Sequence, residues 1–138
     1  LFGEDKDDLE LVNNLLNWMK SNQADYTNTF CNLMNISSIQ DQIYKDKYFL
    51  DWYQNWEKRI LINGRSKENS LELMKKNNPV VIPRNHKVEE ALEAANNNDL
   101  KPMYDLLSIL KKPYTKQTNI ETYQTPSKNQ NYQTFCGT

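Results

Sequence analysis

The stretch from Asn78 to Asp99 reads NPVVIPRNHKVEEALEAANNND, and the rest of the chain is arranged around it. It contains two prolines, Pro79 and Pro83, and the only histidine of the chain, His86. The apolar run between the prolines cannot join a sheet ladder well, because proline has no backbone N–H to donate. We therefore expect a short, buried, extended connector that leads into a helix.

The residues after the connector have the spacing of a helix, with Asn85 or His86 as its expected N-cap. The polar run 96–98 should end this helix, and Asp99 should cap a second helix that closes at Pro113. Two helices joined by so short a turn are expected to pack antiparallel, as a hairpin. The expected inner-face residues are Val88, Ala91, Leu92 and Ala95 in the first helix and Leu100, Met103, Leu106, Leu107 and Leu110 in the second.

Four further helices are predicted before Asn78, within residues 9–19, 26–34, 48–61 and 66–77, from apolar residues spaced three and four apart. Asp25 is the expected N-cap of the second of these helices, Gly64 ends the third, and Ser66 begins the fourth. Residues 35–42 read as a connection, in which Ser37 or Ser38 starts a further turn. The expected inner faces are Leu9, Val12, Leu15, Leu16 and Met19 in the first helix and Phe49, Trp52, Trp56 and Ile60 in the third.

The periodicity vanishes from Tyr114 onward, where a few apolar residues are scattered among polar ones. Such a tail is expected to be either disordered or laid over another surface through its aromatic side chains. No alternation typical of strands occurs anywhere in the chain. The sequence therefore predicts an all-α fold of about six helices, with a helical domain over residues 1–113 and an extended or flexible tail over residues 114–138.

The charge of the chain argues against a nucleic-acid partner. Its 138 residues carry 17 basic and 18 acidic side chains, which gives a formal net charge of −1. Nucleic-acid binding normally needs a basic face that neutralises phosphates. The sequence also shows no leader and no membrane-spanning run, so we expect no membrane partner, a cytoplasmic location, and a chain that is the carboxy-terminal piece of a larger protein.

The residues by themselves do not build an active site. Arg84 could hold a phosphate at a helix N-terminus, but an ion pair within the fold is the simpler interpretation. His86 is better read as a cap or a packing residue than as a general base. Of the two cysteines, Cys31 is expected to be buried in a helix, and Cys136, close to the carboxy terminus, is the more reactive candidate.

Several segments of the sequence resemble a known protein family. The run from Asn78 to Leu92, with the leucines of the following helix and Pro113-Tyr114, resembles the carboxy-terminal region of the selenoprotein O (SelO/YdiU) family. The segment Asp25–Phe30, the tryptophan-bearing helix and the ending Tyr132–Thr138 are similar to segments of the same family. The likeness spans nearly the whole chain.

The resemblance implies an enzyme with a protein-kinase-like fold that transfers AMP from ATP to hydroxyl groups of target proteins, using Mg or Mn. Its nucleotide-gripping, catalytic and metal-binding residues would lie upstream, so no catalytic, cofactor-binding or metal-binding residue is expected here, and no cofactor. The implied partners are the upstream kinase-like domain and the protein substrates. Cys136 would take the place of a redox-regulating cysteine, and the family signature, expected to be structural, would be Pro79, Arg84, Asn85, His86 and Glu89.

Two alternatives stay open at this point. The chain could be an autonomous helical interaction module, whose partner binds the face of Trp52 and Trp56 or the tyrosine-bearing tail. Large aromatic residues at helical spacing are far more often core, however, and we interpret this pair as core. A weaker alternative is a small enzyme centred on Arg84 and His86.

Overall fold

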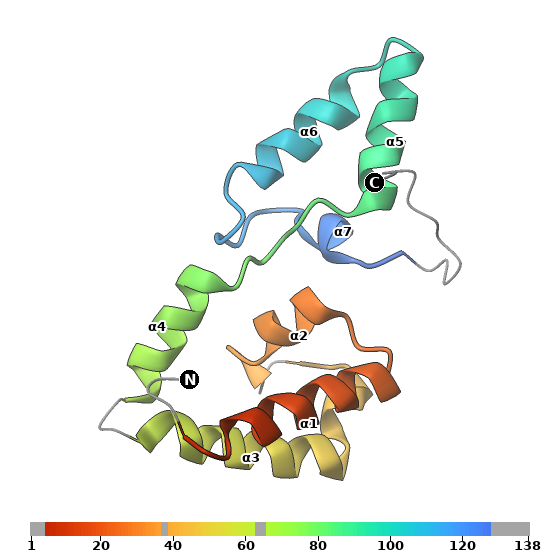
Figure 1. Cartoon of the computed structure of the whole chain (residues 1–138). Helices are drawn as coiled ribbons and strands as arrows, with labels where there is room; N and C mark the ends of the chain where they lie inside the picture. The colour runs from red at the N-terminus through yellow and green to blue at the C-terminus, as the bar shows by residue number, and fades with distance from the viewer. Residues whose placement is uncertain (1–4, 37–38, 63–65, 128–138) are drawn as a thin grey trace. The chain divides into compact units, whose positions relative to one another are not determined.

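The computed structural model describes residues 5–36, 39–62 and 66–127 of the chain (Figure 1). Within these ranges the protein is helical and contains no strand, so the predicted all-α class is confirmed. The elements of this described part are α1 (Asp8–Ser21), α2 (Tyr26–Asn32), the 3-10 helix η2 (Gln42–Lys45), α3 (Lys47–Leu61), α4 (Lys67–Asn77), α5 (Asn85–Asn96), α6 (Lys101–Leu110) and α7 (Glu121–Gln124).

The chain divides into two compact units, Leu1–Asn78 and Pro79–Thr138. The division falls inside the proline-bounded stretch that the sequence singles out. The first unit holds α1 to α4, and the second holds α5 to α7. The separate boundary between a helical domain and a tail at residues 113 and 114 stays a prediction.

Side-chain caps start α2 and α4 of the first unit. The side chain of Asp25 accepts a hydrogen bond from the Asn28 N–H at 2.9 Å, and that of Ser66 accepts one from the Asn69 N–H. Each satisfies a helix N–H that has no partner within the helix, so both predicted caps are confirmed. The expected positions of Ser37, Ser38 and Gly64 lie outside the described residues.

The connection between α2 and α3 contains structure that the sequence pattern did not predict. Asp41 accepts a hydrogen bond from the Ile43 N–H at the start of η2, and Asp46 accepts one from the Phe49 N–H at the start of α3. η2 has only four residues, which is too short for a helical period to show in the sequence. Its Tyr44 is nevertheless buried, so η2 contributes a side chain to the core.

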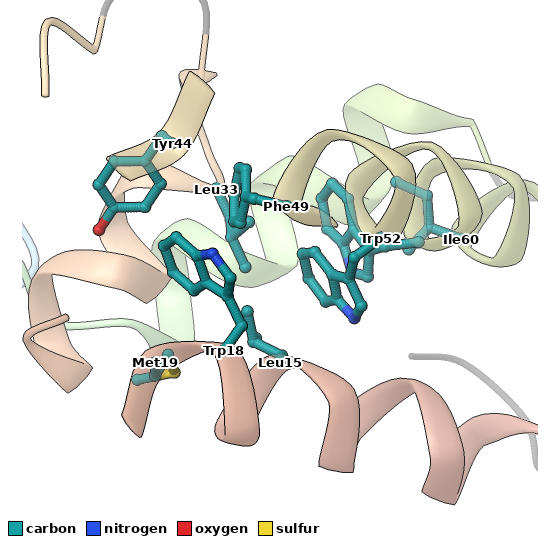
Figure 2. Close-up of a cluster of buried hydrophobic side chains, with 9 residues drawn as sticks. Leu15, Trp18, Met19, Leu33, Tyr44, Phe49, Trp52 and Ile60 are labelled. Carbon is teal, nitrogen blue, oxygen red and sulfur yellow. The ribbon is translucent and has the colours of Figure 1, made fainter. Parts of the chain in front are cut away.

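The core of the first unit is an aromatic cluster around Phe49, whose side chain is fully buried (Figure 2). The ring centroid of Phe49 lies 4.5 Å from that of Trp18, 5.1 Å from that of Tyr44 and 5.8 Å from that of Trp52. Burying side chains of this size contributes about 1.5–3 kcal/mol each. The buried set is Leu15, Trp18, Met19, Leu33, Tyr44, Phe49, Trp52, Trp56 and Ile60.

Polar contacts join α1 to the segments that pack against it. The indole Nε1–H of Trp18 donates to Oδ2 of Asp46 at 2.6 Å, and that of Trp52 donates to the Leu11 carbonyl oxygen at 2.8 Å. The guanidinium of Arg59 donates from Nε and Nη2 to the two carboxylate oxygens of Asp8 at 2.6 and 2.8 Å. A bidentate pair of this kind constrains direction as well as distance, so it holds the start of α1 against the end of α3.

In the second unit, α5 and α6 lie side by side as the predicted hairpin (Figure 1). The turn between them is a Schellman motif: the Asn98 N–H donates to the Ala95 carbonyl, and the Asp99 N–H donates to the Ala94 carbonyl at 2.9 Å. Asn98 has a φ of 63°, the left-handed region that asparagine tolerates better than most residues. The run of asparagines therefore ends α5 as expected.

Some predicted details of the hairpin were wrong. Arg84 is the N-cap residue of α5, while Asn85 and His86 are its first two helical residues, so neither of them is the cap. Leu100 stands at the N-cap of α6, although the Asp99 side chain still accepts a hydrogen bond from the Lys101 N–H. The predicted inner-face residues Leu92, Leu100 and Leu107 are exposed, whereas Ala91 and Leu106 are buried.

The connector between the units is held by residues distant from it in the sequence. The Val80 N–H donates to the Pro113 carbonyl at 2.7 Å, and the Val80 carbonyl accepts from the Gln124 side chain at 2.7 Å. Val81 is only 1% exposed, while Val80 and Ile82 are half-buried, so the predicted burial of the connector is confirmed in part. The helix α7, which follows Ile120, was not predicted, because a single turn leaves no periodic trace in the sequence.

Candidate functional site

The residues of the predicted family signature lie at the start of α5 and just before it. Arg84 is half-buried, and its Nη2 donates to the Gln124 carbonyl oxygen at 3.0 Å, which joins the helix start to α7. Asn85 is exposed, while Pro79, His86 and Glu89 are half-buried. Their structural role and the predicted ion pair of Arg84 stay predictions.

The cavity found in the second unit is not built around Arg84 and His86. It has a volume of about 100 Å³ and is lined by side chains of α5, α6 and the α7 region, among them Lys87, Glu90 and Tyr123. Neither Arg84 nor His86 lines it. The hypothesis of an enzyme centred on these two residues therefore gains no support from this cavity.

The structure describes one of the two cysteines. Cys31 is half-buried in α2, where the sequence predicted a buried side chain. Cys136 lies outside the described residues. The expected difference in reactivity between the two thiols, and the redox role of Cys136, therefore stay predictions.

One candidate site is an apolar groove of about 480 Å³ in the first unit, lined by side chains of α1 to α4. Trp52 and Trp56 of α3 line its inner part, and both are buried, at 6% and 7% exposure. Their rings are stacked, with centroids 6.3 Å apart. The predicted core role of these indoles is thus confirmed, and an interaction module anchored on an exposed tryptophan face loses its main support.

The rim of the groove consists of apolar side chains that remain open to solvent. Val12 is 44% exposed, Leu16 40% and Leu73 43%. Leu9, Val12 and Leu16 were expected on the inner face of α1, but all three are exposed. Leu15 and Met19 are buried as predicted, together with Trp18. Trp18 of α1 contacts Asp46 and the ring of Phe49, whereas Val12 and Leu16 line the groove.

The groove provides little polar or charged chemistry. None of the described residues that line it is charged, and the polar ones among them are Ser70, Asn77 and Asn78, all in or directly after α4. The Asn77 side-chain N–H₂ donates to the Leu73 carbonyl oxygen at 2.8 Å, and that of Asn78 donates to the Phe30 carbonyl oxygen at 3.3 Å. The arrangement is therefore suited to holding apolar side chains, not to acid–base catalysis.

A second, more polar cavity of about 410 Å³ lies beside the Asp8–Arg59 pair, where acidic residues of the first turn of α1 gather. The hydrogen bonds from Arg59 lower the pKa of Asp8, and Asp8 in turn raises the pKa of Arg59. In the part of the chain that the structure describes, no three His, Cys, Asp or Glu side chains are grouped so as to hold a metal ion. Nor does any helix of that part have the length and apolar content needed to cross a membrane.

Comparison with known proteins assigns the chain to a family. Residues 2–111 match the family model described as protein adenylyltransferase SelO. This chain belongs to the SelO family. The resemblance carried by the stretch after Asn78 is therefore confirmed.

Curated members of the SelO family match the chain from end to end. Proteins named protein nucleotidyltransferase YdiU are 47% identical in Pelagibacter ubique, 43% in Nitrosococcus oceani and 44% in Bacillus cereus. Each of these matches covers 100% of the chain and 29% of the relative. The chain thus spans less than a third of the length of these relatives.

The groove is the feature that sequence reasoning missed, although a signal for it was present. Apolar residues of α1 occur at positions 9, 11, 12, 15, 16, 18 and 19, which is more than one helical face can hold. A stripe of that width indicates that a helix contacts apolar surroundings on two sides. The helical spacing predicted five of these residues, Leu9, Val12, Leu15, Leu16 and Met19, on a single inner face.

Proposed function

We propose that this chain is the helical carboxy-terminal segment of a longer SelO-family protein nucleotidyltransferase, which transfers AMP from ATP to hydroxyl groups of target proteins. The observation that carries the proposal is the pattern of the matches: the whole chain aligns with the relatives, but it accounts for only 29% of their length. The resemblance implies that the ATP-binding and metal-binding residues belong to an upstream kinase-like domain.

In this proposal the segment has a structural and regulatory role and no catalytic one. The apolar groove of the first unit supports a structural role, because its rim leaves apolar side chains in contact with water. The expected cofactors of the longer protein, ATP with Mg or Mn, would bind outside the segment. Cys136 would provide redox control, and the protein would act on cytoplasmic protein substrates.

The first test is nucleotide binding. Isothermal titration of the 138-residue chain with ATP and Mg²⁺ should show no binding, because the resemblance implies that the groups that hold the triphosphate lie elsewhere in the family. A full-length SelO-family member in which this chain replaces the matching segment should bind ATP under the same conditions. Tight binding of ATP by the chain alone would contradict the proposed division of roles.

A further inference from the structure

We infer that the groove of the first unit is the seat of an apolar, uncharged helix face contributed by the remaining part of the same longer protein. The inference rests on the proposed function, since it takes the chain as one segment of such a protein. It adds the surface through which the segment is joined to the rest. The groove is formed within the first unit alone, by α1, α2, α3 and α4.

The first argument is the exposure of the rim. Val12, Leu16 and Leu73 are all at least 40% exposed, yet they border a floor of tryptophans that is less than 10% exposed. Removing apolar surface from water is favourable by about 25 cal/mol per Å². Large apolar side chains that surround a recess are therefore stabilised when a matching apolar surface covers them.

The second argument is the chemistry of the lining, which selects the kind of occupant. A nucleotide or another charged ligand would need a counter-charge, and no charged side chain occurs among the described residues of the lining. The side-chain donors of Asn77 and Asn78 are engaged with carbonyl oxygens at the end of the groove. A helix that presents apolar side chains one turn apart satisfies its own backbone groups, so it can enter such a groove without leaving polar atoms unpaired.

The third argument is the amount of protein that the family has beyond this chain. The curated relatives align with it over 29% of their length, so the larger part of such a protein is available to supply the helix. A covalently linked partner also binds at high effective concentration. A recess of about 480 Å³ can therefore be filled in the longer protein without an interface as large as a separate partner needs.

Cysteine labelling tests this assignment with two matched positions. Leu73 at the rim and Leu50 on α3, outside the groove, are both 43% exposed. Leu73→Cys and Leu50→Cys are made separately in a background in which Cys31 and Cys136 are changed to serine. Each variant is made in the 138-residue chain and in a full-length protein, the Pelagibacter ubique relative in which this chain replaces the matching segment. The rate of reaction with a maleimide is then measured for each.

The inference expects labelling at position 73 to be slower by roughly tenfold or more in the full-length protein than in the chain alone, because a seated helix must open before the thiol reacts. Labelling at position 50 should proceed at the same rate in both. Equal rates at position 73 would overturn the inference, and so would equal slowing at both positions. Slowing at position 73 in the chain alone, as its concentration rises, would identify a second copy as the occupant and would also overturn it.

A second measurement separates this inference from the proposed function. Leu73→Asp should lower the midpoint of thermal unfolding more in the full-length protein than in the chain alone, whereas Leu50→Asp should lower both equally. ATP binding by the full-length protein reports on the proposed function independently. If the full-length protein binds ATP and position 73 stays reactive, the docking assignment fails while the proposed function stands. If position 73 is protected and the full-length protein does not bind ATP, the proposed function fails while the docking assignment stands.

Discussion

Asp46 illustrates how one side chain can connect a helix start to the core. Its Oδ1 accepts from the Phe49 N–H at 3.1 Å, and its Oδ2 accepts from the Trp18 indole at 2.6 Å. The hydrogen bond from Trp18, followed by those from backbone N–H groups, lowers the pKa of Asp46 against the opposing effect of burial. One carboxylate thus caps α3 and satisfies a buried indole of α1.

Replacing Asp46 should therefore destabilise the first unit by more than an ordinary cap does. Asp46→Ala is expected to cost roughly 1–3 kcal/mol, since it removes an N-cap and leaves the Trp18 N–H without its acceptor. Asp41→Ala, which removes the exposed cap of η2, is the matched control and should cost less than about 1 kcal/mol. Urea unfolding followed by tryptophan fluorescence measures both, because all three tryptophans lie in the first unit. Equal losses would contradict the double role of Asp46.

The Asp8–Arg59 pair should make the first unit sensitive to acid. Hydrogen bonds from Arg59 hold the pKa of Asp8 below its ordinary value of 3.8. A lowered folded-state pKa contributes stability above the unfolded-state pKa, and this contribution is lost as the pH falls through the folded value. We expect the free energy of unfolding to decline below about pH 4, and the decline to be shallower in Asp8→Asn and in Arg59→Met. An unchanged decline in both variants, measured by urea unfolding from pH 2 to 6, would show that the pair is not its source.

At the scale of elements, the turn that ends α5 sets the geometry of the hairpin. The hairpin of α5 and α6 turns at Asn98, where a left-handed backbone lets two N–H groups reach the last carbonyls of α5. The left-handed conformation costs about 1–2 kcal/mol for most residues with a β-carbon. The cost is smaller for asparagine and small for glycine.

This predicts opposite effects for two substitutions of Asn98. Asn98→Gly should stabilise the hairpin or leave it unchanged, and Asn98→Val should destabilise it by roughly 1–2 kcal/mol. Hydrogen exchange of the α5 and α6 amides measures the change in the second unit, which contains no tryptophan. The same pair of substitutions at Asn97, whose φ is negative, is the control and should not show the opposite signs.

At the scale of the whole molecule, the division at Asn78 and Pro79 separates two units with different kinds of core. The first unit surrounds Phe49 with aromatic rings from several elements. The second is a hairpin with Ala91 and Leu106 in its seam, tied to the connector through Pro113 and Gln124. The apolar groove belongs to the first unit, so the proposed attachment to a larger protein can be tested without disturbing the second.

Much of this organisation could be predicted from the sequence, because local signals carry it. Helical spacing located the six longer helices, and the capping side chains of Asp25 and Ser66 marked two of the starts. The stretch after Asn78 was specific enough to indicate the SelO family. Among the helices in the described part of the chain, η2 and α7 have four residues each and were missed because one turn is too short to show a period.

The sequence by itself thus determined the all-α class, the hairpin, the core role of Trp52 and Trp56, and the family. These properties depend on residues a few positions apart, or on a long run of matching residues. Only the tertiary structure decided which face of α1 is buried and that Val12, Leu16 and Leu73 form the rim of one groove. The physical reason is that the rotation of a helix is set by its partners: the bonds of Trp18 to Asp46 and of Trp52 to the Leu11 carbonyl span 28 and 41 residues, and no local pattern reports contacts at that separation.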